Sequence, residues 1–138
     1  MTAYVDSSTV LRKLLRQPGT LTEWRLIRNP VSSRLTEVEC LRTLDRLHVE
    51  REYSEEDLAR LREGLHRILE AFETVEVTRS VLARAAQPSP TSLGTLDAIH
   101  LSSALAWRER SGTNVLLATH DAALALAARA HGFRVIGA

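Results

Sequence analysis

Hydrophobic and polar positions along the chain follow two alternating periods, one typical of strands and one of helices. Short runs of strand-forming residues predict strands at TAYV (2–5), PVSS (30–33), TVEVT (74–78), NVLLAT (114–119) and FRVIG (133–137). Apolar residues spaced three and four positions apart predict helices over 7–17, 21–28, 36–50, 54–72, 80–87, 96–110 and 121–132. Strands that alternate with helices favour a mainly parallel sheet of about four to five strands between two helical layers, a three-layer α/β/α fold.

The pattern also predicts which residues build the core. The spacing in helix 36–50 places Val38 and Leu41 in the core, with Glu39 at its margin. Leu58, Leu61 and Leu65 are either core residues or a surface for a partner, and the core is favoured. A serine is available as the N-cap of helix 7–17. Because the chain shows no repeat and no linker, we expect one domain over residues 1–138.

Composition and charge narrow the possible functions. The chain is 44% apolar and 25% charged, and its net charge of +1 gives no overall positive field that would indicate nucleic acid. Of the 18 basic residues, all but Lys13 are arginines, whose forked guanidinium groups suit phosphate. Codon composition explains the same bias, so the arginines alone do not identify a ligand.

Cysteine usage and the N-terminal sequence bear on location. Cys40 is the only cysteine, which excludes a disulfide within the chain and argues against a cysteine-based zinc site. The opening stretch MTAYVDSSTVLRKLL lacks the features of a signal peptide, and no segment approaches the roughly 18 apolar residues of a membrane span. We therefore expect a cytoplasmic protein without a membrane partner.

Four acidic residues occupy positions where an α/β sheet presents its ligands. Asp6 closes the first predicted strand, and Asp121 lies two residues beyond the strand that ends at Thr119. Glu39 lies one turn into the helix after the second strand, and Asp97 lies in the first turn of helix 96–110. Ligands of open α/β sheets bind outside the carboxyl ends of the strands, so we expect these carboxylates to converge at that edge.

Converging carboxylates predict a metal site. They repel each other unless a divalent cation lies among them. Oxygen ligands without histidine or cysteine favour Mg²⁺ or Mn²⁺ over zinc. Such ions activate water and stabilise the oxygens of a phosphodiester displacement, with two ions roughly 4 Å apart in the two-metal form.

Each acid also has a purely structural explanation. Asp6 and Asp121 are each suited to cap the following helix, Asp97 suits any helix N-terminus, and Glu39 suits a solvated helix surface. Glu37 is a rival ligand, which we interpret as a surface residue. Taken together, the positions of the four acids at strand ends favour the metal site.

Four stretches of the chain resemble the PIN-domain family, and more narrowly the VapC-like toxins of bacterial type II toxin–antitoxin pairs. They are YVDSSTVLRKLL, VSSRLTEVECLRTL, TLDAIHLSSAL and LLATHDAALALAARAHGFRVI, of which the last two are the more specific. The resemblance implies a parallel sheet between helices, with the metal-binding and catalytic acids Asp6, Glu39, Asp97 and Asp121 at one edge. Ser8 and Thr119 match positions that hydrogen-bond in or beside the site.

The resemblance further implies an endoribonuclease that depends on Mg²⁺ or Mn²⁺, forms a homodimer and is held inactive by a partner antitoxin. His100 lies three residues after Asp97, and we interpret it as a residue that supports the ligands or packs. We interpret His120 as an exposed loop residue and Cys40 as a small buried hydrophobe.

Other folds with acid clusters fit less well. A response-regulator receiver domain needs a lysine late in the chain, and Lys13 lies far too early. A haloacid-dehalogenase-like phosphatase needs an aspartate two residues after the first, where this chain has Ser8. The remaining alternative is a catalytically silent PIN-fold module that binds RNA or protein. That alternative predicts a broken acid set, so the complete set favours the nuclease.

Overall fold

The computed structural model describes residues 1–50 and 53–138. In chain order its elements are β1 (Thr2–Val5), α1 (Ser7–Leu14), η1 (Thr22–Leu26, a 3₁₀ helix), β2 (Asn29–Ser33), α2 (Leu35–Val49), α3 (Glu55–Glu70), β3 (Glu73–Val75), α4 (Arg79–Ala85), α5 (Thr95–Ser111), β4 (Leu116–Ala118), α6 (Ala122–Ala130) and β5 (Arg134–Ile136). The described strands form one five-stranded sheet in the order β3–β2–β1–β4–β5. Every neighbouring pair is parallel, which confirms the predicted α/β fold.

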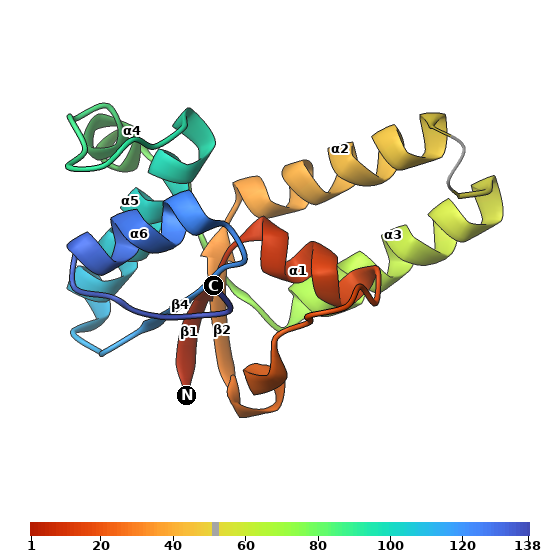
Figure 1. The fold of residues 1–138 in the computed structure, drawn as a ribbon, viewed down its shortest axis with the longest axis horizontal. Helices are drawn as coiled ribbons and strands as arrows, with labels where there is room; N and C mark the ends of the chain where they lie inside the picture. The colour runs from red at the N-terminus through yellow and green to blue at the C-terminus, as the bar shows by residue number, and fades with distance from the viewer. Residues whose placement is uncertain (51–52) are drawn as a thin grey trace.

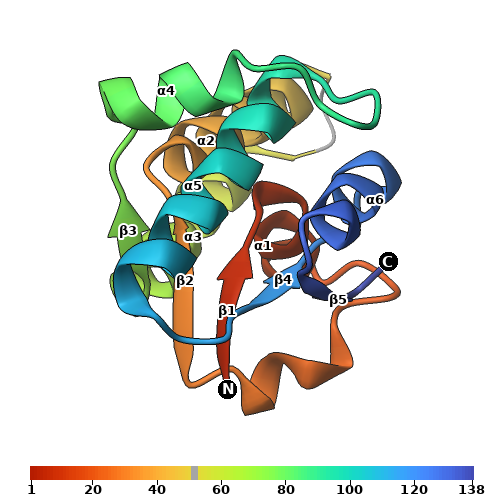
Figure 2. The ribbon, with the colours of Figure 1, turned by 90° about the vertical axis from the view of Figure 1, so that its left-hand side faces the viewer.

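The sheet separates two apolar cores because successive side chains of a strand point to opposite faces. On β1, Tyr4 belongs to the core that contains Leu101 of α5 and Leu124 of α6. Ala3 and Val5 belong to the opposite core, which side chains of α1, α2 and α3 complete. Figure 1 shows these two helical groups on either side of the strands, and Figure 2 shows α5 crossing in front of the sheet.

Helices α2 and α3 form a hairpin that projects away from the sheet (Figure 1). Leu58 and Leu65 of α3 are buried, and Leu61 packs against the same core, so the core interpretation of these leucines is confirmed. The prediction for Val38 is wrong, since this side chain is 50% exposed. The buried stripe of α2 is instead Thr36, Cys40 and Leu44, spaced four residues apart. Two small side chains fill most of that stripe, and small or polar residues carry little weight in an apolar pattern.

Several element limits and one cap also differ from the predictions. Strand β3 stops at Val75 because the Thr78 side chain accepts a hydrogen bond from the Val81 amide and caps α4. The predicted helix 21–28 is a shorter 3₁₀ helix. The N-cap of α1 is Asp6, not a serine. No helix within residues 1–50 and 53–138 has both the length and the apolar character needed to cross a membrane.

Candidate functional site

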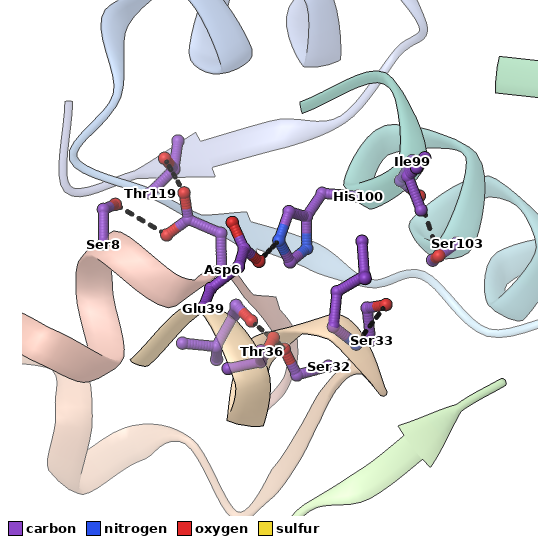
Figure 3. A network of polar contacts seen from close by, with 12 residues as sticks. Asp6, Ser8, Ser32, Ser33, Thr36, Glu39, Ile99, His100, Ser103 and Thr119 are labelled. Carbon is purple, nitrogen blue, oxygen red and sulfur yellow. Dashed lines mark hydrogen bonds and ion pairs between the residues drawn. The ribbon is translucent and has the colours of Figure 1, made fainter. Parts of the chain in front are cut away.

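Asp6 lies at the carboxyl end of the central strand and is almost fully buried, at 3% exposure. One carboxylate oxygen accepts hydrogen bonds from the Thr9 amide at 3.1 Å and the Ser8 hydroxyl at 2.7 Å. The other accepts from the Thr119 hydroxyl at 2.7 Å. Asp6 is therefore both a helix cap and a fixed carboxylate, since these donors hold it in a single orientation (Figure 3).

Thr119 links Asp6 to Asp121. Its hydroxyl oxygen donates to Asp6 and accepts from the Asp121 amide at 2.9 Å. Asp121 in turn caps α6, because one of its oxygens accepts from the Leu124 amide at 2.8 Å. Ser8 adds a second link, because its oxygen accepts from the His120 amide at 3.1 Å. The ends of β1 and β4 are thus joined through the side chains of Ser8 and Thr119.

Glu39 reaches the same region from α2. One of its carboxylate oxygens lies 2.5 Å from Nε2 of His100, a residue of α5 that is only 1% exposed. The other ring nitrogen of His100, Nδ1, lies 2.8 Å from the hydroxyl of Tyr4. No role for Tyr4 was predicted, although the alternation of β1 already places it on the sheet face opposite Ala3 and Val5. The proximity of His100 to Asp97 in sequence was the only other signal for this arrangement.

Asp97 is half-buried in the first turn of α5 but does not cap it, because Gly94 is the N-cap. In the part of the chain that the structure describes, its side chain forms no hydrogen bond. The pKa of Asp97 is raised to about 6, mainly by burial and also by the charges of Asp121, Asp6 and, more weakly, Glu39, while His100 opposes the shift. The structure therefore places Asp97 within electrostatic reach of the other three acids.

The donor set suits a hard divalent cation, although it is not preformed. Among the described residues, no three acidic, histidine or cysteine side chains are close enough to hold an ion. Asp6 and Asp121 accept hydrogen bonds from helix amides and hydroxyls, and Glu39 faces His100. The four candidate ligands are all carboxylates, which is the ligand chemistry that Mg²⁺ and Mn²⁺ prefer. The unpartnered carboxyl group of Asp97 is the clearest sign that this set fits an added cation.

Other residues considered from the sequence lie outside this cluster. Glu37 is half-buried beside Arg34 and His66, in a depression of about 340 Å³ that none of the four acids lines. Cys40 is buried as predicted, and burial raises the pKa of its thiol to about 12. His120 is not the exposed loop residue predicted, because it is partly buried and its Nδ1 lies 2.8 Å from the Gly137 carbonyl oxygen.

Solved structures with a similar fold include three that resemble the chain over most of its length. A toxin–antitoxin complex from Klebsiella pneumoniae matches with a TM-score of 0.64 and 16% identity, over 87% of each chain. PAE2754 from Pyrobaculum aerophilum matches with a TM-score of 0.61 and 20% identity, over 97% of this chain and 89% of the other. FitAB bound to the IR36 DNA fragment matches with a TM-score of 0.69 and 17% identity, over 98% and 94%. Identities this low establish a shared fold alone.

A comparison at the level of sequence gives the family. No curated protein matched the chain. The family model described as PIN domain matches residues 3–130, a range that contains all four acids together with Ser8 and Thr119. With the parallel sheet and the acids near its carboxyl edge, this match establishes that the chain belongs to the PIN domain family.

Proposed function

We propose that the chain is a metal-dependent endoribonuclease and the toxin of a toxin–antitoxin pair. One observation carries the proposal. Four carboxylates lie near the carboxyl edge of the sheet, and within residues 1–50 and 53–138 none of them forms an ion pair with a lysine or arginine. A cluster of acids without a cation is costly, and a divalent ion compensates it while supplying hydrolytic chemistry.

Asp6, Glu39, Asp97 and Asp121 are the residues that would hold Mg²⁺ or Mn²⁺. When bound, such an ion lowers the pKa of water and stabilises the charge that develops on a phosphodiester. The Ser8 and Thr119 hydroxyls orient Asp6 by donating hydrogen bonds to it. The Thr119 hydroxyl also accepts a hydrogen bond from the Asp121 amide, so one set of hydrogen bonds holds two of the acids. Hydrolysis would break the P–O3′ bond, leaving a 5′-phosphate and a 3′-hydroxyl group.

RNA with an exposed backbone is the proposed substrate, because hydrolysis needs direct access to the phosphodiester, which single strands and loops offer. Arginine side chains around this edge would contact the phosphates. Family membership supports the nuclease chemistry, and similar folds in a toxin–antitoxin complex and in FitAB support a protein antitoxin as partner. A homodimer and a cytoplasmic location complete the proposal.

Cleavage of a mixed RNA pool by the purified chain tests the chemistry. We expect cleavage with Mg²⁺ or Mn²⁺, and loss of cleavage both with EDTA and in Asp97→Asn. Asparagine preserves the size of the side chain and removes the charge. No cleavage from a folded protein that binds neither ion would overturn the proposal in favour of a silent PIN-fold module that binds RNA or protein.

Expression in a bacterial host tests the toxin role separately. The wild-type chain is expected to arrest growth, and Asp97→Asn at the same protein level is expected not to. Cleavage in vitro without any growth arrest would support the nuclease activity and contradict the toxin role.

A further inference from the structure

Tyr4, His100 and Glu39 form a hydrogen-bonded chain between three elements that are distant in sequence. Tyr4 of β1 and His100 of α5 are 0% and 1% exposed. The Tyr4 hydroxyl lies 2.8 Å from Nδ1 of His100, and Nε2 of His100 lies 2.5 Å from a carboxylate oxygen of Glu39 on α2. Figure 3 shows the His100 ring meeting Glu39 from the α5 side, with Asp6 beyond it.

The direction of these hydrogen bonds follows from the groups involved. An ionised carboxylate can only accept, so Nε2 of His100 carries the proton that faces Glu39. In a neutral ring Nδ1 then accepts, and the Tyr4 hydroxyl donates to it. Both ring nitrogens therefore form hydrogen bonds. The buried Tyr4 hydroxyl and the Glu39 carboxylate together set the tautomer.

Glu39 differs from the other acids in how it is held. Asp6 and Asp121 each accept an amide hydrogen bond from the helix that they cap. Glu39 lies in the second turn of its helix, has one more rotatable bond than an aspartate, and keeps 18% of its side-chain surface exposed. Its hydrogen bond to His100 is the only one its side chain makes among the described residues.

We propose that His100, held by Tyr4, is a positioning residue that fixes Glu39 for binding of a divalent ion, an inference that rests on the proposed function. Nε2–H occupies one carboxylate oxygen and leaves the other for the ion. The imidazole engages the carboxylate through a single N–H, whereas a lysine or arginine in its place would compete with the ion. Partners of this kind behind a ligand change metal affinity about 10- to 100-fold.

Calorimetric titration with Mn²⁺ tests the role in ion binding. His100→Leu, which fills the space without a donor, is expected to weaken the Mn²⁺ dissociation constant about 10- to 100-fold. His100→Gln, whose amide places a donor near Nε2, is expected to remain within roughly threefold of wild type. Ser102→Ala is the matched control, since Ser102 is a buried polar residue two positions along α5 and its side chain makes no hydrogen bond among the described residues.

RNA cleavage as a function of Mn²⁺ concentration separates positioning from loss of the fold. Activity of His100→Leu is expected to recover when Mn²⁺ is raised about 100-fold, because only the affinity for the ion is reduced. If His100→Leu does not fold, Tyr4→Phe serves instead, and a Mn²⁺ affinity between those of wild type and a variant of Glu39 is expected.

Nuclear magnetic resonance of the metal-free protein tests the hydrogen bonds without any activity. Long-range ¹H–¹⁵N spectra are expected to show His100 protonated at Nε2 and not at Nδ1, with the Nδ1 signal shifted in Tyr4→Phe. Protonation at Nδ1 alone would overturn the inference.

The remaining outcomes separate the two proposals. A wild-type chain that binds Mn²⁺ no more tightly than folded His100→Leu overturns the positioning role and leaves the nuclease in place. A wild-type chain that binds no Mn²⁺ overturns the proposed function and this role together.

Discussion

Three acidic side chains on the surface of the protein pair with arginines, whereas among the described residues none of the four near the carboxyl edge of the sheet has a lysine or arginine partner. On the surface, Arg34 pairs with Glu76 and Arg60 pairs with Asp57. These partners lower the pKa of Glu76 and of Asp57. At the sheet edge, burial and neighbouring acids raise the pKa of Asp97 to about 6.

This contrast separates acids whose charge an arginine compensates from acids that lack such a partner. An exposed ion pair is weak, and its loss changes stability little. A half-buried carboxylate beside other carboxylates destabilises the folded state while it is ionised. The chain contains 18 lysine and arginine residues, yet among the described residues none pairs with the four site acids. An external cation is the simplest compensation.

Removing one site charge is expected to have the largest effect. Asp6→Asn keeps an oxygen that can accept from the Thr9 amide, so the cap of α1 is retained. Mn²⁺ binding and RNA cleavage are nevertheless expected to fall at least about 100-fold, because a charged ligand is lost. Asp57→Asn removes the charge of a surface aspartate in the capping box of α3, far from the site in sequence, and is expected to leave both unchanged. Equal effects of the two substitutions on Mn²⁺ binding and cleavage would contradict the distinction between site acids and surface acids.

Adding the ion is expected to stabilise the wild-type fold. At a Mn²⁺ concentration about 100 times the dissociation constant, the free energy of unfolding rises by roughly 2.7 kcal/mol. This corresponds to an increase in Tm of about 8–12 °C for a domain of this size. The increase is expected to disappear in Asp97→Asn, measured by differential scanning fluorimetry with EDTA as reference. A shift of similar size in Asp97→Asn would place the ion elsewhere on the protein.

Changing the pH of the metal-free protein gives a smaller effect of defined sign. The pKa of Asp97 is about 6 in the folded state against an ordinary value of 3.8, so the folded state binds its proton more tightly. Its contribution to stability is full below about pH 4 and is lost as the pH rises through 6. The Tm of wild type relative to Asp97→Asn is therefore expected to increase from pH 7 to pH 4.5 in EDTA. A difference in Tm between wild type and Asp97→Asn that does not change with pH would contradict the electrostatic coupling of Asp97 to its neighbours.

Breaking a surface pair is expected to have the smallest effect. Arg84 and Glu109 pair at 2.8 Å on neighbouring helices, and 36% and 61% of their side-chain surfaces are exposed. Arg84→Gln is expected to change the free energy of unfolding by less than about 1 kcal/mol, since exposed pairs contribute little. Chemical denaturation measures the change, and Mn²⁺ binding is expected to be unaffected. A loss above about 2 kcal/mol would show that this pair contributes more than exposed ion pairs do.

Residues at the ends of elements were the easiest to predict from the sequence. Asp6 and Asp121 each follow an apolar strand, and the chain must turn into a helix there whatever the rest of the fold does. A short polar side chain at such a position caps the helix and faces the strand ends at once. Asp6 and Asp121 are therefore helix caps in the structure, and capping leaves them near the carboxyl edge of the sheet, where the metal site is proposed.

Residues within helices were harder to predict. Val38 has the spacing of a core residue and is half exposed, because Thr36 and Cys40 occupy the buried stripe of α2. The contacts of His100 depend on a tyrosine 96 positions away and a glutamate 61 positions away. Such contacts have no local period, so no pattern within one element reveals them.

The sequence by itself determined the order of strands and helices, their approximate limits and the acids that stand at their ends. These follow from local periodicity, turn chemistry and capping, which act over a few residues. Only the tertiary structure decided that β1 lies between β2 and β4, that Thr119 bonds Asp6, and that His100 holds Glu39 from the core side. Strand order and long-range hydrogen bonds depend on how the elements pack against each other, and packing joins residues that are distant in the chain.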